Sequence, residues 1–353
     1  MSILRMILSW IYGFFVGIRN ILYDEHLLHS SKVSVPTICI GNLAVGGTGK
    51  TPHTEALARM LSAHYKVAIL SRGYKRKSKG FQLVDSHSSA TSVGDEAMQM
   101  YLNLPDVKIA VCENRVKGCR RLQRLFPDTD VILLDDGFQH RRLQCGYYIL
   151  LTAANKLFVH DHLLPYGRLR EHRYGSLRAN MVIVSKCPSK MRPIDKRVID
   201  SSLNLPTYQH LLFSWLRYGE QKPLFPDGSV QDASSMRKPL VLTGIADVTP
   251  MLDYLRTSYP HLVHLGYSDH HRYSARDIQR LKQCYEQNRC DGIITTQKDA
   301  VRLIESKDLP EALSERTWVL PVEVDMRGQE AEWLSLLSKY INENKQKIRK
   351  EIV

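Results

Sequence analysis

A glycine-rich string near the start of the sequence lies between a short apolar run and a stretch with a helical pattern. The string reads GNLAVGGTGKTP at residues 41–52, the apolar run covers residues 37–40, and the helical pattern covers residues 52–61. A strand, a glycine-rich turn and a helix in this order form a phosphate-binding P-loop, because glycine lets backbone N–H groups approach a phosphate closely. Lys50 is expected to reach the β- and γ-phosphates of a nucleotide, and Thr51 to ligate Mg²⁺.

The string departs from the general P-loop pattern at one position. The pattern G-x-x-x-x-G-K-[ST] expects glycine where Ala44 stands, although Gly46 and Gly47 add flexibility inside the loop. A coincidental glycine turn is the alternative to a nucleotide site. We predict that ATP is bound by consecutive loop residues, which are Gly46, Gly47, Thr48, Gly49, Lys50, Thr51 and Pro52.

Short apolar runs recur after the P-loop and alternate with helical stretches. They cover residues 67–70, 108–111, 131–134, 148–151 and 181–184, and charged residues flank them. Strands buried on both faces of a parallel sheet have this composition, and their alternation with helices indicates βαβ units. We therefore predict an open α/β sheet, in which ligands bind at the carboxyl ends of the strands.

A second α/β block follows a change in composition near residue 206. Residues 210–218 and 223–228 are expected to form two strands with a Pro-Asp-Gly turn, and later apolar runs cover residues 239–243, 292–295 and 318–322. Helical patterns cover residues 250–258, 275–287 and 330–344. The predicted parts are an N-terminal helix at 1–24, a P-loop domain at 25–207, a β-ribbon linker at 208–232 and a smaller α/β domain at 233–353.

Residues 6–18 form a run of 13 residues without a charge, flanked by Arg5 and Arg19. A bilayer span needs about 20 apolar residues, so this run is short for one. On a helix, the small or polar residues form one narrow stripe, which consists of Arg5, Ser9, Gly13, Gly17 and Asn20. Most of the remaining helix surface is apolar, which is typical of a helix that lies in the membrane interface. A helix packed on the protein's own core is the alternative.

The chain carries 49 Lys and Arg residues against 36 Asp and Glu residues, which gives a net charge of +13. Such an excess indicates an anionic partner such as nucleic acid, anionic lipid or a phosphorylated substrate. Basic residues cluster after predicted strands, near residues 72–79, 115–124 and 168–178. These clusters show no RNA-binding signature and no interleaved aromatic residues. We therefore expect an anionic substrate and an anionic membrane surface as partners, and no nucleic acid.

The seven cysteines predict the compartment. Their number is odd and no two have C-x-x-C spacing, so they are expected to be reduced thiols. No signal-peptide cleavage site follows the first apolar run. We expect the chain to be on the cytoplasmic side of the membrane.

Acidic residues stand where strands end and where helices begin. Asp135 and Asp136 follow the apolar run at residues 131–134, which is the Walker-B arrangement for Mg²⁺ beside a P-loop. Asp95 and Glu96 precede a helical stretch, where acids are most often helix caps, although phosphorylation of an alcohol needs a carboxylate to accept the hydroxyl proton. His140 is a candidate contact to phosphate or substrate, and a structural histidine is the alternative.

Short motifs follow one another along the chain in a distinctive order. They are GNL and VGGTGKTP within residues 41–52, SRGY at 71–74, GDE at 94–96, ENR at 113–115, DDGFQH at 135–140, LPYGRLRE at 164–171, DH at 269–270 and KDA at 298–300. Together they resemble the tetraacyldisaccharide 4'-kinase family of lipid A biosynthesis. The resemblance implies ATP-dependent phosphorylation of the 4'-hydroxyl of a tetraacylated glucosamine disaccharide 1-phosphate at the cytoplasmic face of the bacterial inner membrane. It also implies a P-loop kinase-like α/β/α sandwich, joined by a β-ribbon to a second, smaller α/β domain.

The resemblance also implies roles for residues at matching positions. Asp95 would be the general base and His270 its orienting partner from the second domain, although the neighbouring His271 is an alternative partner. The remaining roles are phosphate binding for Lys50, Mg²⁺ binding for Thr51, Asp135 and Asp136, and less certain functions for Glu96, Arg115, His140, Arg170 and Glu171. The sequence departs from the commonest family pattern at Ala97, where proline is usual, and at Gln297, where glutamate is usual.

A ParA/MinD-like membrane-cycling ATPase is the alternative from the same fold class. Those proteins resemble this chain in the string GGTGKT but carry a signature lysine directly before the two glycines. Val45 stands at that position here, which disfavours this alternative.

Overall fold

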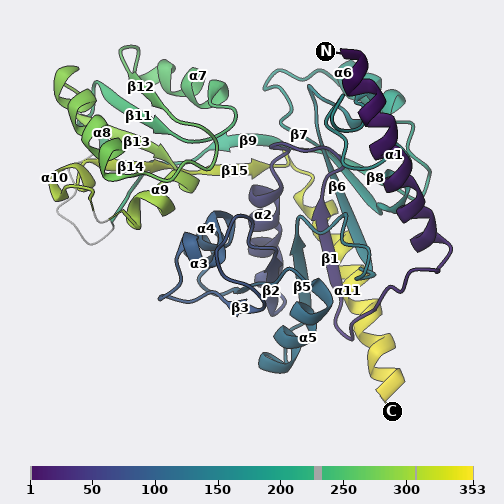
Figure 1. Cartoon of the computed structure of the whole chain (residues 1–353). Coiled ribbons are helices and arrows are strands. Elements are labelled where there is room, and N and C mark those ends of the chain that lie inside the picture. Colours follow the sequence, from purple (N-terminus) through teal and green to yellow (C-terminus); the bar gives the residue numbers. More distant parts are fainter. Residues whose placement is uncertain (1, 226–232, 307, 353) are drawn as a thin grey trace.

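The computed structural model describes residues 2–225, 233–306 and 308–352, which form two α/β domains side by side (Figure 1). The larger domain contains an eight-stranded sheet in the order β3-β4-β2-β5-β1-β6-β7-β8. Its strands are β1 Thr37–Gly41, β2 Val67–Ser71, β3 Gln82–Leu83, β4 Lys108–Val111, β5 Val131–Asp135, β6 Tyr147–Ala153, β7 Met181–Ser185 and β8 His210–Phe213. Neighbouring strands are parallel except for β3, which pairs with β4 in the antiparallel direction. The apolar runs predicted as buried parallel strands are thereby confirmed.

Helices cover both faces of the large sheet, which makes the domain an α/β/α sandwich. Its helices are α2 Lys50–Ser62, α3 Ala90–Val93, α4 Asp95–Asn103, α5 Arg115–Leu125 and α6 Pro193–Leu203, with 3₁₀ turns η1 Phe158–His160 and η2 Arg173–Arg178. Apolar side chains of α2 and α4, including Leu57 and Met100, pack in one core. Side chains of α5 and α6, including Leu122 and Leu203, pack in the core on the other face. Two buried faces explain why the strands are apolar without alternation.

The smaller domain contains a five-stranded sheet in the order β10-β14-β13-β11-β12. Its elements are β10 Lys222–Pro223, η3 Ala233–Ser235, β11 Pro239–Thr243, α7 Thr249–Ser258, β12 Val263–Gly266, α8 Ala275–Gln287, β13 Gly292–Thr296, α9 Gln297–Ile304, α10 Glu311–Ser314 and β14 Thr317–Leu320. The sequence did not predict β12, because this edge strand has only one buried side chain, Leu265, and so carries little apolar signal. A capping box of Ser274 and Asp277 begins α8, whose helical pattern the sequence predicted.

A two-stranded ribbon of β9 Trp215–Tyr218 and β15 Val322–Asp325 connects the domains. The sequence predicted a local hairpin within residues 208–232. Residues 210–213 instead form β8, because Leu212 and Phe213 are buried in the large sheet, and the partner of β9 comes from a distant part of the chain. The predicted Pro-Asp-Gly turn at 226–228 lies outside the described residues, as does the predicted boundary at residue 232.

The last helix, α11 Glu330–Ile352, packs on the larger domain. Its residues Trp333, Leu337 and Ile341 follow one another at helical spacing and are buried in the core that contains α2 and α4. The sequence assigned residues 233–353 to the smaller domain, whereas the chain returns through β15 to the larger one. Helical periodicity predicts which face of a helix is apolar, but it does not predict which domain covers that face.

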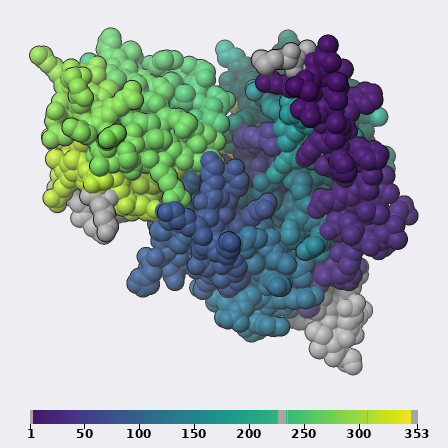
Figure 2. All heavy atoms as spheres, viewed as in Figure 1, coloured from purple at the N-terminus to yellow at the C-terminus, as the bar shows by residue number. Residues whose placement is uncertain are grey.

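The N-terminal helix, α1 Ser2–Asp24, runs along the outer surface of the larger domain, on the side away from the smaller domain (Figures 1 and 2). The predicted small-or-polar stripe faces the protein except at Arg5, which is exposed: Ser9 Oγ donates to the carbonyl of Leu163 at 2.8 Å, and Asn20 is buried. The opposite face is exposed, with Trp10 77% and Phe15 66% accessible. Residues 3–24 are long and apolar enough to cross a membrane by length and composition, although the uncharged run itself is shorter.

Candidate functional site

The P-loop connects the end of β1 to the start of α2 and is held from outside by side chains. Asn42 Nδ2 donates to Thr48 Oγ1 at 3.0 Å, and Ser185 Oγ donates to the Thr48 carbonyl at 2.8 Å. Gly49 has a φ of 85°, which favours glycine. The backbone N–H of Thr48 donates to the carbonyl of Gly46 at 3.1 Å, and the first N–H groups of α2 lie at a helix N-terminus, which suits a phosphate.

Lys50 lies beside the two acids that end β5. Its Nζ donates to Asn42 Oδ1 at 3.3 Å and lies 3.9 Å from Asp136 Oδ2. Burial lowers the pKa of Lys50, while the nearby carboxylate of Asp136 opposes this shift. Asp136 also accepts hydrogen bonds from both Nη atoms of Arg170, at 3.2 and 2.9 Å. The strand order therefore places an ammonium, a carboxylate and a guanidinium at one edge of the sheet.

The acids Asp135 and Asp136 have opposite electrostatic environments. Burial raises the pKa of Asp135 to about 6, and the neighbouring Asp136 adds to the rise. Burial opposes ionisation of Asp136 as well, but Lys50 and Arg170 hold its pKa below the usual range. A buried carboxylate with a raised pKa is stabilised in its charged form by a cation.

This donor set fits Mg²⁺, which binds proteins through one or two carboxylates and takes its other ligands from water and phosphates. The hydroxyl of Thr51, in the first turn of α2, would be the P-loop's own oxygen ligand for such an ion. Among the described residues, no group of three or more His, Cys, Asp or Glu side chains could hold a metal ion by itself. The set therefore suits an ion that arrives with a nucleotide.

Asp95 is the first residue of α4 and receives three hydrogen bonds from the smaller domain. His270 Nδ1 and Arg302 Nε each lie 3.0 Å from Asp95 Oδ2, and Arg302 Nη2 lies 2.6 Å from the same oxygen. Burial alone would raise the pKa of Asp95, but His270 and Arg302 lower it to about 2. A carboxylate only accepts hydrogen bonds, so His270 must carry its proton on Nδ1. The structure thus brings two residues predicted from sequence together and adds Arg302 to them.

His271 does not contact Asp95. Its Nε2 lies 3.0 Å from Asp277 Oδ2, and its ring stacks on Tyr267 with centroids 4.4 Å apart. His270 has a φ of 60° and turns toward the larger domain, where its ring meets the edge of Tyr74 at 5.5 Å. Of the two candidate partners, the structure therefore brings His270 to Asp95.

One face of α9 and its C-cap contact the larger domain. Lys298 Nζ donates to Glu96 Oε1 at 2.9 Å, Arg302 bonds Asp95, and Glu305 accepts from the backbone N–H of Ala90. Lys298, Arg302 and the C-cap residue Glu305 are spaced by four and three positions, so they lie on the same side of α9. The KDA string at 298–300 was recognised in the sequence, but Arg302 was not predicted as a site residue. Its spacing of four positions from Lys298, one helical turn, is the signal that could have identified it.

Arg115 and His140, two of the predicted site residues, lie against each other. Arg115 is 2% exposed, and its Nη atoms donate to the carbonyls of Cys112 and Asp135 at 2.6 and 3.3 Å. The backbone N–H of Arg115 donates to His140 Nε2 at 3.3 Å. Burial and surrounding arginines, first Arg115 and then Arg72, lower the pKa of His140 to about 4. Arg115 therefore connects the chain at the ends of β4 and β5. The cationic surroundings of His140 suit the binding of an anion.

Glu171 joins α1 to the loop beside the nucleotide site. This buried carboxylate accepts from Asn20 Nδ2 at 3.1 Å, Gln139 Nε2 at 2.9 Å and Arg178 Nη2 at 2.8 Å. Gln139 also donates to the carbonyl of Asn42 at 2.9 Å. Glu171 therefore connects α1 with the loop after β5 through hydrogen bonds.

Lys186 is a further cation that sequence reasoning missed. It follows β7 with a φ of 55°, and its Nζ lies 3.8 Å from where a Cβ on Gly47 would stand. Burial lowers its pKa, while Asp247 of the smaller domain opposes the shift. A single lysine after an apolar strand gives no sequence signal of its own.

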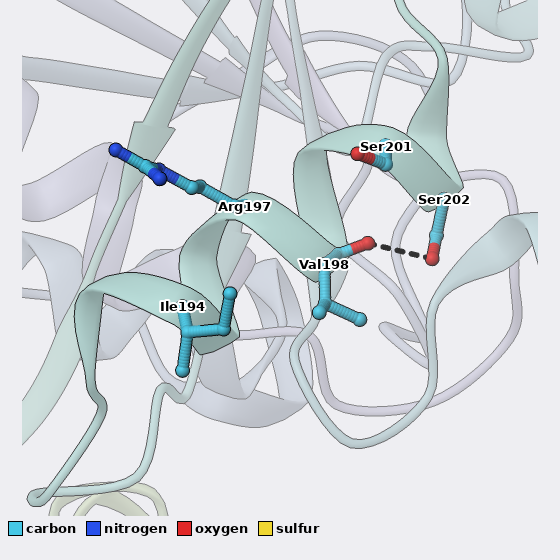
Figure 3. Close-up of a pocket in the computed structure, with 5 residues that line it drawn as sticks. All are labelled: Ile194, Arg197, Val198, Ser201 and Ser202. Atoms are coloured by element: carbon cyan, nitrogen blue, oxygen red, sulfur yellow. Dashed lines mark hydrogen bonds between the residues drawn. The ribbon is translucent and has the colours of Figure 1, made fainter.

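An open hollow of about 400 Å³ on the outer surface of α6 offers no comparable chemistry (Figure 3). Its lining residues are Ile194, Arg197, Val198, Ser201 and Ser202. They include one cation and no acid. The titratable groups of the candidate site lie instead at the strand ends and across the domain boundary.

Known proteins are similar to this chain in sequence or structure over nearly their whole length. The model of the family described as Tetraacyldisaccharide-1-P 4'-kinase matches residues 1–342. The tetraacyldisaccharide 4'-kinase of Bacteroides thetaiotaomicron is 44% identical over 350 residues, covering 95% of this chain and 92% of the relative. That of Flavobacterium johnsoniae is 40% identical over 354 residues, covering 98% and 99%. The crystal structure of LpxK from Aquifex aeolicus in complex with ATP has a TM-score of 0.73 and 27% identity, and covers 96% of this chain and 98% of that one.

Proposed function

The chain belongs to the tetraacyldisaccharide-1-P 4'-kinase family, and from this premise we propose how its residues perform the reaction. Members are phosphotransferases that act on a hydroxyl group, so the chain is an ATP-dependent kinase of a lipid A precursor. The acceptor is the 4'-hydroxyl of a tetraacylated glucosamine disaccharide 1-phosphate. The ParA/MinD-like alternative is not supported, because the family match extends over residues 1–342.

Charge neutralisation and positioning of the reactants account for most of the catalysis of phosphoryl transfer. In our proposal the loop at residues 46–52 binds the phosphates of ATP through its N–H groups, and Lys50 binds the β- and γ-phosphates. Thr51, Asp135 and Asp136 would hold Mg²⁺, which supplies positive charge to the transferring group. Arg170 keeps Asp136 oriented through its two hydrogen bonds.

The observation that carries the proposal is the hydrogen bonding of Asp95. Three donors from His270 and Arg302 occupy Oδ2, and no hydrogen bond to Oδ1 occurs within the described residues. Oδ1 is therefore available to accept the proton of the attacking 4'-hydroxyl. His270 and Arg302, which hold Oδ2, both belong to the smaller domain. The relative position of the two domains therefore decides whether the Asp95 carboxylate is oriented for the reaction.

We also propose that the protein binds the cytoplasmic face of the inner membrane through α1. The exposed apolar face of this helix and the flanking Arg5 and Arg19 match a membrane interface with anionic headgroups. Gly13 lets the helix approach the loop at Leu163, since a Cβ there would lie 2.6 Å from the Leu163 side chain. The lipid acceptor would then reach the site at the membrane surface.

Mass analysis of the lipid product tests the proposed reaction. The purified protein is incubated with ATP, Mg²⁺ and detergent-dispersed tetraacyldisaccharide 1-phosphate, and we expect one added phosphate on the distal glucosamine. Lys50→Ala is the matched control and should give no product above background. Release of free phosphate without a phosphorylated lipid would contradict the proposal.

A further inference from the structure

A buried histidine connects the P-loop to the base of the interdomain ribbon. His53 lies in the first turns of α2 and is completely buried. Its Nδ1 lies 2.7 Å from the carbonyl oxygen of Gly49, and its Nε2 lies 2.8 Å from Ser214 Oγ. Gly49 precedes Lys50 directly, and Ser214 precedes the first ribbon residue, Trp215.

The proton positions in this arrangement follow from its partners. A carbonyl oxygen only accepts, so Nδ1 must donate its N–H to Gly49. Nε2 of the neutral ring then accepts the hydroxyl proton of Ser214. Burial lowers the pKa of His53 to about 4, so the ring is neutral at physiological pH. One tautomer thus satisfies both neighbours, and removal of either partner leaves a buried polar atom without a hydrogen bond.

Ser214 is fixed at the point where the chain leaves the large sheet. Its backbone N–H donates to the carbonyl of Val184, and its own carbonyl accepts from Cys187, so it remains attached to the end of β7. The ribbon begins at the next residue and leads to the smaller domain. The second ribbon strand, β15, also packs against α2. Both connections between the domains therefore meet the helix that begins at the P-loop.

We propose that His53 and Ser214 form a positioning link that couples the conformation of the P-loop at Gly49 to the base of the ribbon that carries the smaller domain. The inference rests on the proposed function only in requiring that the P-loop binds ATP. The smaller domain supplies His270 and Arg302 to Asp95, so the site is complete only when that domain is correctly placed. The link lets nucleotide binding at the loop influence that placement.

The test measures hydrogen exchange in the full-length protein with and without Mg²⁺-ATP. In the unsubstituted protein ATP should slow exchange both in the P-loop and in the ribbon strands β9 and β15. In Ser214→Ala we expect the P-loop response to persist and the ribbon response to disappear. The dissociation constant of ATP, measured by calorimetry, should rise about 5- to 10-fold, as expected for the loss of a coupling between two sites.

A matched variant separates coupling from a loss of stability. Thr317→Val removes a buried hydroxyl that bonds the Leu313 carbonyl within the smaller domain, so it should lower the melting temperature and leave the ribbon response unchanged. His53→Leu should reproduce the effect of Ser214→Ala, and the double variant should be no worse than the more affected single variant. A ribbon response that persists in Ser214→Ala, or that is absent from the unsubstituted protein although it binds ATP, would overturn the link alone. Failure of the unsubstituted protein to bind ATP would overturn the proposed function together with the link.

Discussion

Arg302 Nη2 of the smaller domain lies 2.6 Å from Asp95 Oδ2 of the larger domain. Both side chains are largely buried, and Arg302 is itself fixed by Asp299 and by the carbonyl of Gly244. The guanidinium therefore reaches the carboxylate in a single orientation. A carboxylate held this way is ionised over the whole physiological pH range, and in our proposal its other oxygen accepts the proton of the acceptor hydroxyl.

Replacement of Arg302 by Met should change the pH dependence of catalysis. Arg302 is one of the groups that hold the pKa of Asp95 at about 2, so its removal should raise that pKa. The acidic limb of the kcat/KM profile should then move upward by about one to two pH units. Arg302→Lys keeps the charge and should move the limb less. An unchanged limb in Arg302→Met would show that Arg302 does not act on the ionisation of Asp95.

Replacement of Asp95 by Asn should lower kcat by about 10²- to 10⁴-fold, because it removes the proton acceptor and keeps the shape of the side chain. Asp277→Asn is the matched control, since Asp277 accepts a hydrogen bond from the neighbouring histidine, His271, and lies outside the site. Circular dichroism of both variants should show the fold of the unsubstituted protein, while the loss of the charge that pairs with buried Arg302 should lower the melting temperature of Asp95→Asn. Near-normal turnover of Asp95→Asn would remove this residue as the base.

Part of this arrangement is predictable from the sequence, and the reason differs between residues. Strands such as β5 are buried on both faces, so their apolar runs and the acids that end them indicate the sheet and its ligand edge. Arg115 follows a strand like a ligand-binding residue, but its side chain turns into the protein. Sequence position alone cannot distinguish these two directions. Arg302 contacts Asp95 only because α9 packs against α4, and this long-range packing cannot be read from the local sequence.

Replacement of Trp333 by Ala should destabilise the larger domain, although this residue follows the smaller domain in the chain. Trp333 is 1% exposed and packs in the core that contains α2 and α4. Loss of a buried Trp costs about 3–5 kcal/mol. Urea unfolding, with proteolysis of the large-domain core as the readout, measures the free energy of unfolding of the larger domain. Ser335→Ala, on the exposed side of α11, is the control. Selective unfolding of the smaller domain in Trp333→Ala would contradict the packing of α11.

The buried Glu55 should make stability depend on pH. It accepts amide hydrogen bonds from Gln99 and Asn103 of α4, and burial raises its pKa to about 7. Between about pH 4 and pH 7 the folded state then holds a proton that the unfolded chain releases, so the free energy of unfolding falls as pH rises. Buried His53, with a pKa lowered to about 4, contributes the opposite slope below about pH 6.5.

Glu55→Gln isolates the contribution of this carboxyl, because His53 is common to both proteins. Relative to the variant, the unsubstituted protein should lose up to about 3 kcal/mol between pH 4.5 and pH 8. Chemical denaturation at several pH values measures this difference. Exposed Glu332→Gln serves as the control and should leave the difference near zero. Parallel stability curves for Glu55→Gln and the unsubstituted protein would show that Glu55 keeps an ordinary pKa when folded.

The outer face of α1 should determine membrane binding. Phe14 and Phe15 are 65% and 66% exposed and contact each other at 5.7 Å between ring centroids, so they are available to enter a bilayer interface. Replacing both by Asp removes apolar contacts worth about 2 kcal/mol each. The fraction bound to vesicles with anionic lipid should therefore fall by tenfold or more, and deletion of residues 2–22 should move the protein into the soluble fraction. Leu102→Asp on α4 is the control for a general loss of surface apolarity, since Leu102 is 51% exposed on another helix. Unchanged vesicle binding after the double replacement would mean that α1 does not attach the protein to the membrane.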